Sequence, residues 1–215
     1  MLNQLGMAAK KAASSLAKLT QTEKNNALLA VADALVANAD SIIQANDIDM
    51  KNAIANNMSE GLLDRLRLTK ERFDDMAEGI RQIVSLDDPI GEVLSMKQRP
   101  SGLIIGQKRV PMGVIGFIYE SRPNVTVDGF SLCFKTSNAV ILRGGSDCIH
   151  SNIALVKVIK QALASVNVTP DAISLIENTD REIARQFMKL NKYVDLLIPR
   201  GGAGLIRTVV ENAII

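Results

Sequence analysis

The chain has 215 residues, of which 47% are hydrophobic and 22% are charged. A chain of this size can bury about 70% of the surface that it exposes when unfolded, which is enough for one substantial core. This composition excludes a disordered, collagen-like or disulfide-dense chain. The formal net charge of +2 is too small to predict attraction to nucleic acid or to a membrane surface, so we expect neither as a partner.

The cysteines and the hydropathy pattern predict a cytoplasmic protein. Cys133 and Cys148 have no histidine or cysteine at metal-ligand spacing, so we expect buried, reduced thiols and no metal site. No uncharged apolar run approaches the roughly 18 residues of a membrane span. Residues 1–11 also lack the apolar core of a signal peptide.

Residues 1–86 predict a helical segment, because apolar residues recur at helical spacing while Gly and Pro are scarce. Thr20 and Glu23 form a capping-box pattern at the start of one helix. The charges are evenly scattered, so we expect solvated outer faces and no chemical role for this segment. Four helices are expected, over residues 2–18, 22–38, 40–56 and 69–85.

Residues 87–111 predict a β-hairpin or a pair of strands joined by a turn. Proline and glycine punctuate two short β-prone runs there, at residues 92–96 and 103–107.

Residues 112–215 alternate short apolar runs with helical segments. This alternation is typical of a parallel sheet with right-handed crossovers, so we predict an α/β fold: N-terminal helices followed by an incomplete doubly wound, Rossmann-like sheet. Ile214 and Ile215 are expected to begin another strand. The expected strands are residues 114–119, 139–142, 173–176 and 194–198, and the expected helices are residues 125–137, 148–165, 180–190 and 203–212.

The loop after the second of these strands predicts a phosphate site. In open parallel sheets, ligands bind beyond the carboxyl ends of the strands. Gly144 and Gly145 allow backbone amides to approach an anion, and Arg143 supplies a planar fork of donors, with Ser146 beside them. Arginine at a position where an acidic residue would bind the ribose of NAD favours NADP. The alternative interpretation is a glycine turn with a solvated arginine.

Two further loops carry candidate site residues. Pro199, Arg200, Gly201 and Gly202 form a loop that is similar to a phosphate loop only in outline, because it lacks the lysine and hydroxyl residue of kinase loops, and it is equally compatible with a flexible turn. Asn124 follows the first strand, where its amide is either an oxyanion donor or a helix cap.

Three other features are less informative. His150 lies in a predicted helix, where we expect a surface or interface residue, and Cys133 is a poor nucleophile candidate because nothing near it in sequence lowers its pKa. The dinucleotide fingerprint GxGxxG is missing after the first strand, which argues against a standard Rossmann grip on the cofactor.

Four motifs together resemble the γ-glutamyl phosphate reductase (glutamate-5-semialdehyde dehydrogenase) family of the aldehyde dehydrogenase superfamily. The resemblance runs from residue 1 to about residue 212. The motifs are RVPMGVIG at residues 109–116, YESRPNVTVD at 119–128, NAVILRGG at 138–145 and LIPRGGAG at 197–204.

This resemblance implies NADPH-dependent reduction of L-glutamyl 5-phosphate to glutamate 5-semialdehyde and phosphate, a step of proline biosynthesis. It implies that Arg143, Gly144 and Ser146 meet the adenosine ribose and 2′-phosphate of NADP(H), and that the loop from Pro199 to Gly202 lies near the pyrophosphate and nicotinamide. By the same resemblance, Asn124 matches the side-chain oxyanion donor of the superfamily. A homo-oligomer is also implied, and an association with glutamate 5-kinase is allowed.

One departure from the family concerns the nucleophile. Family members are longer, and their catalytic cysteine lies in a later segment resembling QRPSTCN, which does not occur here. We therefore expect the N-terminal part of such a reductase, inactive alone, with an N-terminal helical part at 1–86, a hairpin at 87–111, a truncated NADP-binding region at 112–215 and no catalytic domain. The alternative is an autonomous dinucleotide-binding or subunit-interaction module.

Overall fold

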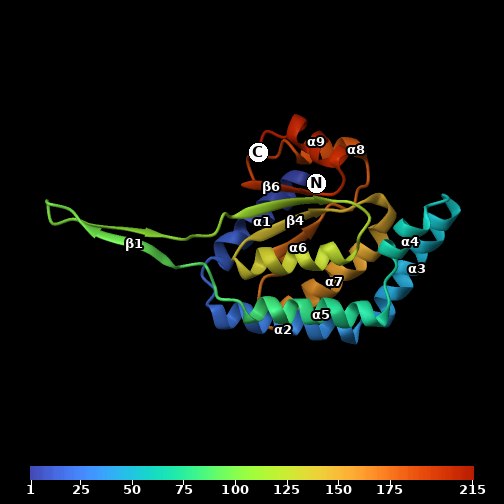
Figure 1. Cartoon of the computed structure of the whole chain (residues 1–215), viewed down its shortest axis with the longest axis horizontal. Coiled ribbons are helices and arrows are strands. Elements are labelled where there is room, and N and C mark those ends of the chain that lie inside the picture. The colour runs from blue at the N-terminus through green and yellow to red at the C-terminus, as the bar shows by residue number, and fades with distance from the viewer.

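Four parallel strands form the central sheet of the computed structural model, which describes residues 1–215 (Figure 1). The strand order is β5-β4-β3-β6. Every residue of β3, β4 and β5 is buried, whereas the edge strand β6 is half-buried. The predicted α/β fold is confirmed. The strands are β3 (Val114–Tyr119), β4 (Ala139–Arg143), β5 (Ile173–Leu175) and β6 (Leu196–Arg200).

Helices cover both faces of this sheet. Because crossovers between parallel strands are right-handed, the stepwise order from β3 to β4 to β5 places α6 and α7 on one face, and the return to β6 places α8 on the other. Contacts confirm these two faces, because neighbouring residues of a strand point to opposite sides of the sheet. Phe117 of β3 lies against Gly129 of α6, whereas the adjacent Gly116 lies against Phe187 of α8. The helices are α6 (Asn124–Lys135), α7 (Ile149–Ser165), α8 (Arg181–Phe187) and α9 (Ala203–Asn212).

The N-terminal helices pack onto both faces of the sheet layer. The first helix contacts β4, and its residue Leu2 lines one cavity together with Ile183 of α8. The second and fifth helices pack against each other and cover α6 and α7 (Figure 1). The helices α1, α2, α3 and α5 contribute to one core with the sheet, whereas Leu66 of α4 packs in a small separate cluster with Met50, Ala53 and Cys148. They are α1 (Leu2–Leu16), α2 (Gln21–Ala37), α3 (Ala39–Ala55), α4 (Glu60–Leu66) and α5 (Lys70–Ser85).

The predicted helices and the capping box of Thr20 and Glu23 are confirmed, with two differences elsewhere. The short helix α4 was not predicted, because seven residues give too little periodicity to detect. The predicted strand at Ile214 and Ile215 is wrong: these residues form no strand, and the Ile214 N–H donates to the Met188 carbonyl instead.

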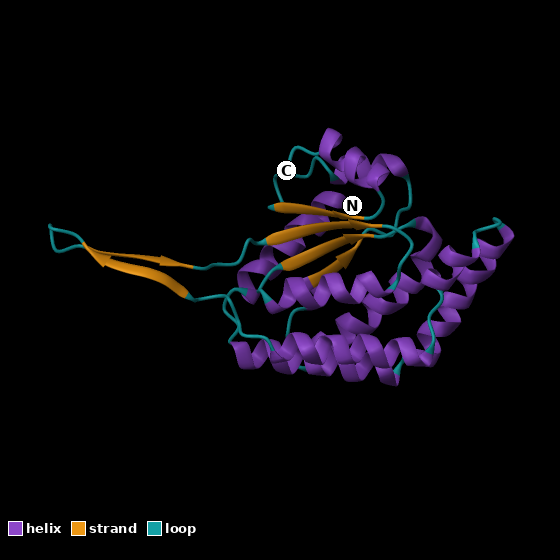
Figure 2. Cartoon of the chain, in the orientation of Figure 1, coloured by secondary structure: helices purple, strands orange, loops and turns teal.

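The predicted hairpin is confirmed and extends away from the body as an arm (Figure 2). It consists of β1 (Val93–Gln98) and β2 (Ile104–Lys108), paired antiparallel. Its large apolar side chains are exposed; Met96 is 65% exposed and Ile104 is 62% exposed. These side chains form an apolar surface that the rest of the chain does not cover.

No single helix has both the length and the apolar character to cross a membrane. Taken together, α2 and α3 have the length and the apolar composition of a membrane span, but the two helices are bent by 67° relative to each other. Both helices contact α7.

Candidate functional site

The loops that follow β3, β4 and β6 meet at one edge of the sheet. Ser121 Oγ, after β3, donates a hydrogen bond of 2.7 Å to Asp147 Oδ2, after β4. The backbone N–H of Gly202, after β6, donates one of 3.0 Å to Glu120 Oε2. The structure therefore brings three of the sequence-predicted loops together.

Arg143 ends β4 and is only 8% exposed, so it is not the solvated arginine of the alternative interpretation. Its Nη2 donates to the Thr179 carbonyl at 2.8 Å, its Nη1 donates to the Gly144 carbonyl, and its buried Nε has no partner. Burial lowers the pKa of this guanidinium from its usual value. One buried donor is thus left free for another acceptor.

The glycines after Arg143 permit close packing between loops. A Cβ atom at Gly144 would lie 3.0 Å from Tyr119 Cζ and would overlap the Asn152 amide, and one at Gly145 would lie 3.1 Å from the backbone nitrogen of Ser121. Ser146, the next residue, is exposed at the start of a 3₁₀ turn. Contacts within the chain therefore already require glycine at position 144, and the approach of these glycines to an anion stays a prediction.

Polar side chains behind this loop form a buried chain of hydrogen bonds. Tyr119 Oη lies 2.6 Å from Thr126 Oγ1, which donates to Asn152 Oδ1 at 2.8 Å. Burial raises the pKa of Tyr119, so its hydroxyl stays protonated. These bonds link β3, α6 and α7 directly beneath the loops.

The loop after β6 is built around Glu120. A Cβ atom at Gly201 would lie only 2.5 Å from Glu120 Cδ, so glycine is needed for the carboxylate to reach the N–H of Gly202. Pro199 pairs with Ile118 in the parallel ladder, and Arg200 is exposed. An acidic side chain thus occupies a free amide at the N-terminus of α9, a position that favours negative charge.

Asn124 is the first residue of α6, and its Nδ2 lies 3.4 Å from Asp128 Oδ2. The N-cap residue is Pro123, and no side chain caps this helix, so the helix-cap interpretation of Asn124 is wrong. Burial raises the pKa of Asp128, and the nearby Arg200 opposes that shift. The role of Asn124 as an oxyanion donor stays a prediction.

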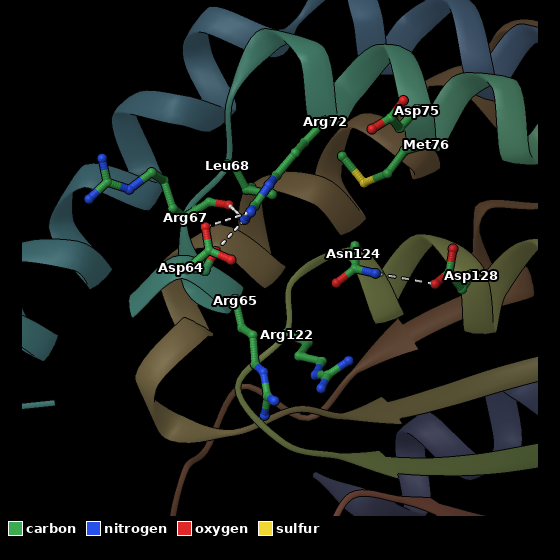
Figure 3. A pocket seen from close by; sticks show the side chains of 10 residues that line it. All are labelled: Asp64, Arg65, Arg67, Leu68, Arg72, Asp75, Met76, Arg122, Asn124 and Asp128. Carbon is green, nitrogen blue, oxygen red and sulfur yellow. Dashed lines mark hydrogen bonds and ion pairs between the residues drawn. The ribbon is translucent and has the colours of Figure 1, made fainter. Parts of the chain in front are cut away.

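Two cavities lie beside these loops and share Arg65 and Arg122 in their walls. The larger, of about 630 Å³, is lined by Leu62, Arg65, Tyr119, Glu120, Ser121, Arg122, Val125, Arg200, Gly201 and Gly202. The smaller, of about 310 Å³, is lined by Asp64, Arg65, Arg67, Leu68, Arg72, Asp75, Met76, Arg122, Asn124 and Asp128 (Figure 3).

The structure adds residues to which sequence reasoning gave no role. Arg65, Arg67 and Arg72 belong to the helical segment, yet they line the cavity that contains Asn124. The available signal was three arginines within eight residues, spaced two and five apart on either side of a predicted helix start. Even scatter of charge over the whole segment concealed this local cluster.

The burial of the two thiols and the exposure of His150 agree with the sequence-based predictions. Cys133 and Cys148 are free and buried, and burial raises the pKa of each thiol to about 12. His150 is exposed. No group of three or more His, Cys, Asp or Glu side chains is arranged to hold a metal ion.

Comparison with known proteins gives close relatives. The chain is 59% identical to γ-glutamyl phosphate reductase from Lachnospira eligens over 212 residues, which is 99% of this chain and 51% of that protein. It is 54% identical to the enzyme of the same name from Enterococcus faecalis, again covering 99% and 51%. The chain spans about half the length of the curated relatives it matches.

Solved structures show the same likeness. The γ-glutamyl phosphate reductase of Thermotoga maritima superposes with a TM-score of 0.98 at 41% identity, covering all of this chain and 52% of the other. The enzyme of the same name from Saccharomyces cerevisiae superposes with a TM-score of 0.90 at 31% identity, and the match covers 99% of this chain and 54% of the other. The predicted resemblance is thereby confirmed. The aldehyde dehydrogenase family profile matches residues 2–214, and the chain belongs to that family.

Proposed function

We propose that this chain is the cofactor-binding part of a γ-glutamyl phosphate reductase, which uses NADPH to reduce L-glutamyl 5-phosphate to glutamate 5-semialdehyde and phosphate. The observation that carries the proposal is the convergence of the loops after β3, β4 and β6 beside two cavities, in a chain 59% identical to a protein of that name. A cytoplasmic location, homo-oligomerisation and association with glutamate 5-kinase belong to the same proposal.

The donors at this edge fit a phosphorylated dinucleotide. Arg143 keeps a buried Nε–H without a partner, which suits an oxygen of the 2′-phosphate, with Ser146 exposed beside it. Arg200 and the amides of Gly201 and Gly202 line the larger cavity, where the pyrophosphate and nicotinamide would lie. Two β-strand ends would thus hold the two ends of one cofactor.

NADPH, when bound, supplies the hydride that converts an acyl group to an aldehyde. Asn124 would donate its side-chain N–H to the acyl oxygen as negative charge develops there. The proposed reaction would need a thiolate to attack the acyl carbon, with phosphate leaving with the C–O bonding pair. The hydride that the cofactor would supply would then convert the resulting acyl thioester to the aldehyde and release the thiolate. Neither Cys133 nor Cys148 supports this step here, because both thiols are buried and protonated.

Cofactor binding tests the proposal directly. We expect the purified 215-residue chain to bind NADPH saturably, with NADPH fluorescence as the readout, and to show no semialdehyde formation. Measurable turnover by this chain alone, abolished in Cys133→Ser, contradicts the assignment of the nucleophile to a segment outside these residues.

Activity is tested in a chimera. In this chimera, the 212 matched residues of the Lachnospira eligens reductase are replaced by those of this chain. The Lachnospira eligens protein supplies the other half of the enzyme. We expect NADP⁺ reduction in the reverse direction, dependent on glutamate 5-semialdehyde and inorganic phosphate. A folded chimera that reduces NADP⁺ without any phosphate requirement contradicts the proposed reaction.

The hairpin arm favours a second candidate, a binding or subunit-interaction module. Its exposed apolar side chains, including Met96 and Ile104, have no cover within the chain. If the chain is a module, it is soluble and monodisperse, binds NADPH and joins a full-length reductase in co-elution. Aggregation that Met96→Lys and Ile104→Lys relieve, without such co-elution, supports the first candidate instead.

A further inference from the structure

Arg65 and Arg122 are distant in the sequence but line the same wall between the two cavities. Arg65 lies on α4, whereas Arg122 lies in the loop between β3 and α6. Both line both cavities, and Figure 3 draws them among the residues that line the smaller one. The two arginines are therefore the boundary between the cavity of Gly201 and Gly202 and the cavity of Asn124.

Both arginines are exposed, and neither forms an ion pair with another side chain of the chain. The side-chain hydrogen bonds of arginines in this chain belong to Arg72, Arg81 and Arg143. Arg72, in the same cavity, is bonded within the chain: its Nη2 lies 2.9 Å from Asp64 Oδ1, and its Nη1 donates to the carbonyls of Asp64 and Arg67. Arg72 thus holds the connection between α4 and α5 in place. The donors of Arg65 and Arg122 remain available.

Two unpaired guanidinium groups at one wall repel each other unless an anion lies between them. Guanidinium donors match phosphate oxygens in bidentate geometry, and a phosphate dianion neutralises both charges. Glu120 is the only acidic side chain in the larger cavity, and it is already bonded to Gly202. The smaller cavity also contains three aspartates: Asp64, which pairs with Arg72, and Asp75 and Asp128. The occupant that this wall favours is therefore a phosphoryl group.

We propose that Arg65 and Arg122 form the binding site for the phosphate group of an acyl phosphate substrate. This inference rests on the proposed function, and it names the residues that hold the leaving group. Positive charge here stabilises the phosphate as the acyl–oxygen bond breaks.

Phosphate of the substrate and pyrophosphate of the cofactor share this chemistry, and the positions of the residues favour the substrate. The smaller cavity joins Arg65 and Arg122 to Asn124 but contains no residue of the loops after β4 or β6. Arg143, Gly144 and Ser146 line neither cavity. The two arginines therefore border the loop after β6 on one side and, on the other, a space that the proposed cofactor loops leave open.

Binding of inorganic phosphate to the 215-residue chain tests the site without any turnover. We expect saturable binding in calorimetry or ³¹P NMR, weakened about 10-fold in Arg65→Gln and in Arg122→Gln. Arg185→Gln is the matched control, because Arg185 makes only an exposed contact of 3.6 Å with Glu182. Equal binding in all four proteins overturns the proposal. Displacement of the phosphate by saturating NADPH also overturns it, since the arginines then hold the cofactor.

Kinetics of the chimera provide a second readout. In the reverse direction we expect Arg65→Gln and Arg122→Gln to raise the KM for phosphate about 10-fold while the KM for NADP⁺ stays unchanged. A raised KM for NADP⁺ alone overturns the inference but leaves the proposed function intact. A folded chimera without NADP⁺-dependent activity contradicts the proposed function, and the phosphate titration of the 215-residue chain still decides the role of the arginines.

Discussion

The carboxylate of Glu120 accepts a 3.0 Å hydrogen bond from the backbone N–H of Gly202, joining the end of β3 to the start of α9. The glycine at position 201 makes this contact sterically possible, because a Cβ atom there would collide with the Glu120 side chain. The Glu120 carboxylate thus accepts the hydrogen bond that the Gly202 N–H would otherwise donate to an anionic cofactor. Anion binding at this loop requires Glu120 to move or to share that amide.

Removing the charge of Glu120 tests this competition. Glu120→Gln keeps an oxygen acceptor for the Gly202 N–H but removes repulsion toward a pyrophosphate, so we expect NADPH to bind the 215-residue chain about 3- to 10-fold more tightly. Fluorescence titration measures the affinity. Glu211→Gln, on the same helix but exposed at its far end, is the control and should change nothing. Unchanged or weaker binding by Glu120→Gln would show that the pyrophosphate lies elsewhere.

Substitution of Arg143 tests the choice between phosphorylated and unphosphorylated cofactor. Arg143→Ala should weaken NADPH binding by about 1.5 to 3 kcal/mol, the usual magnitude of a charge-assisted contact, while sparing NADH. The ratio of the two affinities is the measurement to use, because Arg143 also bonds the carbonyls of Gly144 and Thr179 and its loss disturbs both loops. Equal losses for both cofactors would assign Arg143 a purely structural role.

The elements of this fold are predictable from sequence, whereas much of the candidate site is not. Buried apolar runs such as that of β4 predict strands. The topology of a parallel sheet then places the residues that follow each strand at the carboxyl end of the sheet. Arg65 could not be placed in this way. It reaches the site on α4, a helix too short to predict, and its position depends on contacts such as that of Asn46 with the Leu66 carbonyl, 20 residues apart.

Buried charges were equally invisible in the sequence. Asp49 is 2% exposed and accepts bonds from the N–H groups of His150 and Ser151, about a hundred residues away. It therefore occupies the N-terminus of α7, so this helix end is closed to a phosphate. Local sequence shows an ordinary helical aspartate at position 49, because only the packing of α3 on α7 creates the contact.

The ion pair between Lys24 and Asp88 should contribute strongly to stability. Lys24 is 1% exposed; its Nζ lies 2.5 Å from Asp88 Oδ2 and donates to Ser137 Oγ at 2.9 Å. Asp88→Ala leaves a buried ammonium group without its counter-ion, so we expect a loss of about 3 kcal/mol in the free energy of unfolding. Urea denaturation measures the loss.

A matched exposed pair provides the control for that measurement. Asp33→Ala removes the partner of Arg81, whose pairing at 2.9 Å is solvent-exposed, and should cost less than about 1 kcal/mol. The double variant Lys24→Met/Asp88→Ala should be less destabilised than the sum of its single changes, because no uncompensated charge remains buried. Additive losses would mean that the two side chains stabilise the chain independently.

The raised pKa of the buried thiols makes stability depend on alkaline pH. In the folded chain burial raises the pKa of Cys133 from about 9 to about 12, so between these values only the unfolded chain releases the proton. The contribution of the protonated thiol is fully present at pH 8 and is lost progressively as the pH rises from about 9 toward about 12.

Comparison of the wild type with Cys133→Ala isolates this effect from other titrating groups. We expect the stability advantage of the wild type to fall by about 1 kcal/mol between pH 8 and pH 10 in urea denaturation. An advantage that stays constant over this range would mean that the Cys133 thiol ionises as readily in the folded chain as in the unfolded one, and that it is accessible to the solvent after all.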